Sequence, residues 1–266
     1  MSSGEVTDRL RLICSEVGFA LDSVTPELVA RLELLAEYTE TTSDSERMIS
    51  VAHAVFRYQE ATRPAEAFSP SERRIVVLGC LFSDIGKTGP AGADVDGQRL
   101  VAEIFAVEGV RDDRQPVNEF FRTYFPADAE ERIRRFSGLG LDPGISIREF
   151  WNLHSGWTLQ IAEAGGVPPE AIAAAATHHL LEDVNPDAIV GADRNFTRQF
   201  GDNAAFDRAE KLVILVDKYD ALRRRAGRSH EQAIQWLHDR IESNPRFRGD
   251  AEFASLIADL DAVAGP

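Results

Sequence analysis

The amino-acid sequence predicts an all-α protein on three observations. Apolar residues recur at helical spacing over most of the 266 residues. The short apolar runs that would suit strands, such as LVILV at 212–216, lie inside longer helical patterns. Helix start signals are frequent, and the pair Thr25-Pro26 gives an N-cap followed by a proline in the first turn. Together these features predict a bundle of helices with a sizeable core.

The individual helices follow from the same signals. A first helical region spans about 5–40 and contains TPELVARLELLAEY. The segment TTSDSE starts a second helix, which carries Val51, Val55 and Tyr58 on one face with His53 nearby. A third helix starts at SPSERR and runs through IVVLGCLFSD as far as Gly86.

Residues 90–146 are irregular, with loop-like stretches around the short helices RLVAEIFAV and PVNEFFRTYF, and we predict an inserted segment or lid. Four better-defined helices follow, and a terminal helix lies near 250–263. We expect an N-terminal extension over 1–44, a main domain over 45–245 and a C-terminal helix within 246–266. The four helices are expected at about 147–165, 168–182, 205–225 and 229–243.

Composition excludes several classes of partner. The chain has 44 acidic and 29 basic residues and a formal net charge of −15, which opposes binding to duplex nucleic acid or to an anionic membrane. No apolar run reaches the ~20 residues that cross a bilayer. Two cysteines, Cys14 and Cys80, do not make a disulfide framework, and the N-terminus lacks a secretory pattern. We therefore expect a cytoplasmic protein.

The stretch LFSDIGKTGP at 81–90 allows two interpretations. Gly86, Lys87 and Thr88 give the GKT that closes a phosphate-binding loop, but that loop needs a glycine where this chain has Leu81. Asp84 would also place a carboxylate among the phosphate oxygens. No G-x-S-x-G motif supports a serine nucleophile either. The remaining interpretation is a metal motif around Asp84.

Four of the six histidines lie in helical, largely apolar segments, and two aspartates accompany them. A single buried histidine is usually a hydrogen-bonded core residue, and Asp84 alone could be an ordinary helix end. Asp217, however, interrupts LVILVDKYDAL, where a carboxylate is costly unless it is paired or bound to a cation. Imidazoles and carboxylates together suit Mn, Fe, Co, Ni or Zn, so the sequence predicts one or two divalent ions. The four histidines are His53, His154, His178 and His179.

In this order, His53, SDIGK, REFWNLHSGW, THHLLEDVNP and LVDKYDAL resemble the HD superfamily of metal-dependent phosphohydrolases. Within it the chain is most similar to the HD-GYP branch, which hydrolyses cyclic dinucleotides. The resemblance implies an HD-domain-like helical bundle with an N-terminal extension and an insertion. The chain departs from the pattern at Ser83, which replaces the first histidine of the His-Asp doublet, and at VNP (184–186), which replaces GYP. Ile49 stands where some members have a glutamate, so no third ion is expected.

The resemblance also implies a role for each site residue. Asp84 would bridge two ions, His154 and His178 would complete one position, and His179 would point ~100° around the same helix. The other position would take His53, Asp84 and Asp217, and Ser83 would be a poor ligand there.

Lys87 and Arg228 would contact phosphate, although a solvated helix end remains the alternative for both. The implied function is a metal-dependent phosphodiesterase acting on a cyclic dinucleotide or a related phosphorylated molecule. The alternative is a degenerate regulatory or scaffold protein. A protein partner or a homodimer is left open.

Overall fold

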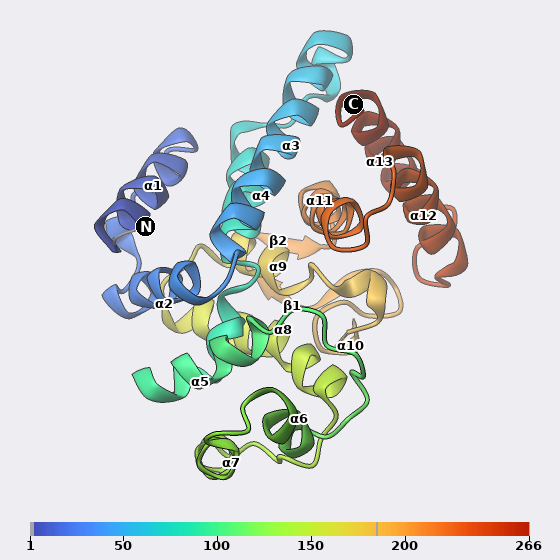
Figure 1. The fold of residues 1–266 in the computed structure, drawn as a ribbon. Helices are drawn as coiled ribbons and strands as arrows, with labels where there is room; N and C mark the ends of the chain where they lie inside the picture. The colour runs from blue at the N-terminus through green and yellow to red at the C-terminus, as the bar shows by residue number, and fades with distance from the viewer. Residues whose placement is uncertain (1–2, 185, 266) are drawn as a thin grey trace.

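The computed structural model describes residues 3–184 and 186–265, which form a helical bundle, as the sequence predicts (Figure 1). Within these residues no helix combines the length and the apolar character that a membrane crossing requires. The N-terminal half contains α1 (Ser3–Glu16), α2 (Pro26–Tyr38), α3 (Thr41–Thr62), α4 (Pro70–Phe82), α5 (Val95–Phe105), α6 (Val117–Tyr124) and α7 (Ala129–Gly138). The C-terminal half contains α8 (Ile147–Ala164), α9 (Pro169–Ala176), α10 (Pro186–Ile189), α11 (Arg208–Arg224), α12 (His230–Ser243) and α13 (Ala251–Val263).

Helix α4 is the centre of the bundle and packs against α3, α9 and α11. It begins at a capping box in which Ser69 and Glu72 satisfy each other's backbone N–H groups. A Cβ atom on Gly79 would lie 2.7 Å from the Cβ of Ala174, so glycine is needed where α4 crosses α9. This close crossing brings the C-terminal ends of the two helices near each other.

Two elements differ from the prediction. A small antiparallel hairpin, β1 (Asn195–Phe200) and β2 (Asn203–Ala205), lies between α10 and α11, where we predicted no strands. The rings of Phe196 and Phe200 are buried and contact each other, and Phe196 also contacts Phe206. Helix α7 was not identified from the sequence because half of its ten residues are charged and only Ala129 and Phe136 are buried. Tertiary burial of aromatic residues stabilises both elements.

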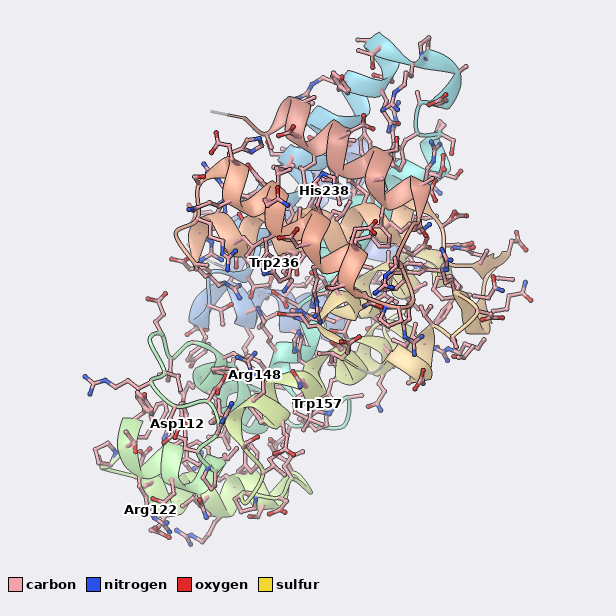
Figure 2. The ribbon with its side chains drawn as sticks, turned by 90° about the vertical axis from the view of Figure 1, so that its right-hand side faces the viewer. Asp112, Arg122, Arg148, Trp157, Trp236 and His238 are labelled. Atoms are coloured by element: carbon pink, nitrogen blue, oxygen red, sulfur yellow. The ribbon has the colours of Figure 1, made fainter. Side chains whose placement is uncertain are left out.

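The predicted insertion contains α5, α6 and α7. Helix α5 packs against α2, and α6 packs against α7 and α8. In Figure 2 Arg122 of α6 and His238 of α12 lie toward opposite ends of the molecule, so the insertion lies away from the C-terminal helices. Phe105, at the end of α5, packs edge-on to the ring of His154, with 5.6 Å between the ring centroids. The insertion thus supports one of the predicted ligands directly.

Candidate metal centre

Asp84 lies in a turn that is locked against α8. Helix α4 ends at Phe82, and a 3₁₀ helix, η3 (Ile85–Thr88), follows. The hydroxyl of Thr158 donates to the carbonyl of Ser83 at 2.8 Å and accepts from the N–H of Gly86 at 3.0 Å. A Cβ atom on Gly86 would lie 2.0 Å from the carbonyl oxygen of His154, so only glycine permits this approach. The sequence DIG therefore sets Asp84 beside His154.

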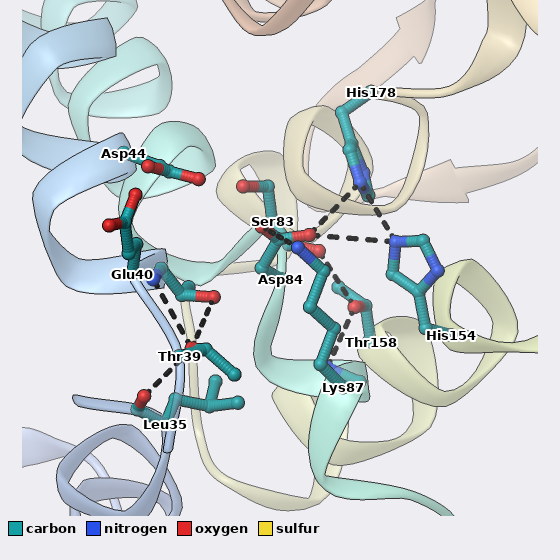
Figure 3. Close-up of polar contacts among 12 residues, drawn as sticks. Leu35, Thr39, Glu40, Asp44, Ser83, Asp84, Lys87, His154, Thr158 and His178 are labelled. Carbon is teal, nitrogen blue, oxygen red and sulfur yellow. Dashed lines mark hydrogen bonds and ion pairs between the residues drawn. The ribbon is translucent and has the colours of Figure 1, made fainter. Parts of the chain in front are cut away.

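Four predicted ligands converge at this turn, and Figure 3 shows three of them, Asp84, His154 and His178. One ligand atom from each of Asp84, His154, His178 and His179 lies within 4.8 Å of the others. The Nε2 atoms of His154 and His178 are 3.2 Å apart, and they lie 3.5 and 3.6 Å from Oδ1 of Asp84. Ligands held ~2.1 Å from one ion are separated by roughly 3.0–4.2 Å. A small contraction of the cluster would therefore fit one ion, so these four residues could hold a metal.

The tautomers of two histidines leave the cluster short of protons. Nδ1 of His154 lies 2.5 Å from the carbonyl oxygen of Trp151, and Nδ1 of His178 lies 2.6 Å from that of Ala175. A carbonyl oxygen only accepts, so Nδ1 carries the hydrogen, and Nε2 is a bare lone pair whenever the ring is neutral. Two lone pairs that face each other repel unless a cation lies between them. Such backbone contacts are the usual outer partners of metal-bound histidines.

His179 is oriented by a different partner. Its Nδ1 contacts the carboxylate of Glu182 at 2.7 Å, and the same oxygen of Glu182 pairs with Nζ of Lys218 at 2.8 Å. Burial opposes the charge of Glu182, but His179 and Lys218 hold the pKa of this carboxyl well below its usual range. Lys218 therefore holds the ionised carboxylate of Glu182 in place, and this carboxylate orients the ring of His179 so that its other nitrogen faces the cluster. This pair was not identified from the sequence.

The charges at the cluster favour an ionised acid among neutral imidazoles. Burial opposes the ionisation of Asp84, yet the ammonium group of Lys87, whose Nζ is 2.6 Å from Oδ2, holds the pKa of Asp84 well below its usual value. Burial and the two neighbouring histidines lower the pKa of His154 far below its usual value. Burial also lowers the pKa of His179. A carboxylate with neutral imidazoles is the donor set that divalent transition metals prefer.

One part of the predicted geometry is wrong. We expected a helix over 168–182 that would turn His178 and His179 about 100° apart. Helix α9 ends at Ala176, and the two histidines lie in the turn before a second 3₁₀ helix, η4 (Leu180–Glu182). Outside helical geometry both rings can face the same side, and their centroids are only 4.0 Å apart. This is why a single position collects all three histidines.

The structure places two predicted residues apart from the cluster. His53 packs against Phe56, with 5.7 Å between the ring centroids, and the charges that act on it come from other residues, among them Glu16 and Arg73. Arg228 lies at the edge of a surface hollow beside Trp236, and the cluster does not line this hollow. Apolar periodicity could not distinguish a histidine on this side of α3 from one facing Asp84.

A second group of charges adjoins Asp84 on the side opposite the histidines. Figure 3 shows Asp44 of α3 on that side, beyond Ser83. Asp44 is buried and pairs with three arginines, from α3 and from the end of α11. We call this group the arginine side. It consists of Asp44, Asp217, Arg47, Arg224 and Arg225. The sequence shows a run of three arginines at 223–225, which could have indicated this group. We selected Arg228, further along the same basic stretch, as the candidate phosphate contact instead.

Ser83 and Asp217, which we assigned from the sequence to the second ion position, do not belong to the group of ligand atoms around Asp84. The hydroxyl of Ser83 donates to the carbonyl of Cys80 at 3.1 Å. Asp217 is half-buried, and its Oδ2 atom is buried without a hydrogen-bond partner among the described residues. Burial raises the pKa of the Cys80 thiol, as expected for an inert core cysteine.

Comparison with known proteins gives no match: no protein family, no curated protein and no solved structure is significantly similar to this chain. The geometry of the cluster therefore carries the functional argument.

Proposed function

We propose that the protein is a metal-dependent phosphohydrolase of the HD-GYP type that acts on a phosphodiester, with a cyclic dinucleotide as the implied substrate. The observation that carries the proposal is the pair of backbone-anchored imidazoles of His154 and His178, whose Nε2 atoms face each other and the ionised Asp84. A buried cluster of this kind is costly to maintain unless a cation completes it. The order of SDIGK, the three histidines and Asp217 agrees with the resemblance to that family.

The residues around the cluster suit an anionic substrate. A bound divalent ion would lower the pKa of a water molecule and polarise a phosphoryl oxygen. Lys87 bonds Asp84 in this structure, and its ammonium group has further N–H donors, so it can contact a phosphate oxygen near the cluster while it stays on Asp84. Thr158 and Gly86 keep the turn that carries Asp84 and Lys87 fixed. Phe105 and Phe150 exclude water from the face behind His154.

The experiment measures metal content and hydrolysis together. Protein purified without chelator should contain a divalent transition metal and should hydrolyse bis(p-nitrophenyl) phosphate. Asp84→Ala should remove both properties, while His53→Ala, which lies apart from the cluster, should retain both. Equal rates for the wild type and Asp84→Ala would contradict the proposal.

Substrate preference needs a separate measurement. The motif GYP of the family corresponds to Val184, Asn185 and Pro186 in this chain, so valine replaces its glycine and asparagine its tyrosine. Asn185 lies outside the described residues. We expect binding of cyclic di-GMP without an exclusive preference over other cyclic and linear dinucleotides. Calorimetry against such a panel tests this, and strong selectivity for cyclic di-GMP alone would contradict it.

A second candidate function is ligand binding without turnover. It is favoured by Ser83, whose hydroxyl bonds the backbone instead of facing the cluster. In that case metal and dinucleotide would bind, hydrolysis would be absent from the wild type, and Ser83→His would raise metal content or turnover. A wild type that hydrolyses the diester at a rate abolished by Asp84→Ala would exclude this candidate.

A further inference from the structure

Asp84 has two carboxylate oxygens, and the structure uses them differently. Oδ1 faces His154 and His178, whereas Oδ2 accepts a bond of 2.6 Å from the ammonium group of Lys87. A carboxylate that bridges two ions must give one oxygen to each of them. In this protein the second oxygen already has a cation, supplied by a side chain three residues along the same turn.

Beyond Lys87, the arginines of the arginine side pair with Asp44 and Asp220. Nη2 of Arg225 bonds Oδ2 of Asp44 at 2.9 Å, and Arg224 bonds the same oxygen at 2.5 Å. Arg47 also pairs with Asp44 and reaches Asp220 at 2.9 Å. In the described residues the carboxylates of Asp44 and Asp217 do not join Asp84 in a group tight enough for one ion.

Asp217 connects the two sides. It has a buried oxygen without a hydrogen-bond partner among the described residues, although a buried carboxylate normally requires one. Partial burial opposes the charge of Arg225, but Asp84, Asp44 and Asp217 together hold the pKa of its guanidinium above the usual value. Arg225 thus bonds Asp44 directly and acts electrostatically on Asp84 and Asp217, and 55% of its side chain remains exposed.

We propose that Lys87 and Arg225 take the place of a second metal ion, so that the centre holds a single ion between Asp84 and the three histidines. This inference rests on the proposed metal site and specifies it. It narrows the prediction of one or two ions to a single ion, because the second position has fixed cations that no change of metal concentration removes. A single ion beside two fixed cations also selects for an anionic ligand.

The test counts ions on the whole chain with Mn²⁺ alone as the probe. Wild-type protein titrated with Mn²⁺ should bind about one ion per chain and give the electron paramagnetic resonance spectrum of isolated Mn²⁺. Lys87→Met combined with Arg225→Met should take up a second, weaker ion and give the spectrum of an exchange-coupled pair. Arg223→Met is the matched control, since its guanidinium bonds only the carbonyl of Arg228 among the described residues, and it should behave as the wild type.

The outcomes separate the two proposals. Two ions or a coupled spectrum in the wild type would overturn the inference even if the double variant does not fold, a point that circular dichroism checks. A folded double variant that still binds one ion would also overturn it. A wild type that binds no ion would overturn both the proposed function and the inference that rests on it, whereas two ions in the wild type would overturn the inference alone.

Discussion

Asp84 lies between two buried polar groups, the three histidines on one side and the arginine side on the other, and these groups differ in how their charges are compensated. On the histidine side, polar atoms converge without enough protons or cations: two imidazoles present bare lone pairs to each other and to Oδ1 of Asp84. On the arginine side, every guanidinium has a carboxylate partner, and buried Asp44 has three. The comparison teaches that buried polar clusters differ in what they lack. A cluster that lacks positive charge indicates a cation site, whereas a cluster that contains it indicates a fixed structure.

The largest effect is expected from Asp84, which belongs to both sides. Asp84→Asn should abolish ion binding and should cost the ion-free protein about 3 kcal/mol of unfolding free energy at neutral pH, because it leaves Lys87 without its carboxylate. The measurements are Mn²⁺ titration and chemical denaturation.

The pH dependence of this cost gives the control. The pKa of Asp84 is held below its usual value in the folded protein, so its stabilisation is complete above the unfolded-state pKa of about 3.9 and is lost as the pH falls toward the folded-state value. The difference in stability between wild type and Asp84→Asn should therefore shrink below about pH 4. A difference that persists unchanged at lower pH would show that the aspartate stabilises the fold without its charge.

Breaking the histidine side alone should affect the ion and leave the fold. His178→Ala should weaken Mn²⁺ binding more than about 100-fold, because loss of a direct ligand exceeds the 10–100-fold cost of losing an outer partner. His53→Ala is the matched control, since it removes the same side chain from α3 away from the cluster. Similar ion affinities for the two variants would mean that His178 is an ordinary core histidine.

The outer partner of His179 provides a smaller, graded effect. Glu182→Gln keeps the shape of the side chain but removes the charge that pairs with Lys218 and orients His179. Mn²⁺ affinity should fall by about 10–100-fold. Glu231→Gln, an exposed acid on α12, makes the same chemical change and should leave the affinity as in the wild type. An unaltered affinity in Glu182→Gln would remove His179 from the set of ligands.

The smallest effect on the ion is expected from the arginine side. Asp44→Asn should lower the unfolding free energy by about 1–2 kcal/mol, a discounted value because its three arginine partners are partly exposed. Mn²⁺ affinity should change by no more than about threefold, which is below 1 kcal/mol. Loss of ion binding in a folded Asp44→Asn protein would show that Asp44 is itself a ligand and would end the contrast between the two sides.

The sequence by itself determined the helical class, many helix ends and the four residues of the cluster, because these depend on local chemistry. Thr25 and Ser229 cap α2 and α12 as their neighbours in the sequence require. Asp84 and the histidines stood out as polar residues in apolar segments, a conflict that is visible without coordinates.

Only the tertiary structure decided which charges meet. The end of α9 at Ala176 freed both adjacent histidines to face one position. The crossing of α4 and α9 at Gly79 and the contact of Gly86 with α8 then brought Asp84 to them. The packing of α3 and α11 against α4 determines that Asp44, and not His53, lies near Asp84. The same packing determines that Arg225, and not Arg228, pairs with Asp44. Periodicity assigns a residue to a face of its own helix, but the partner of that face is fixed by close packing between segments distant in the sequence.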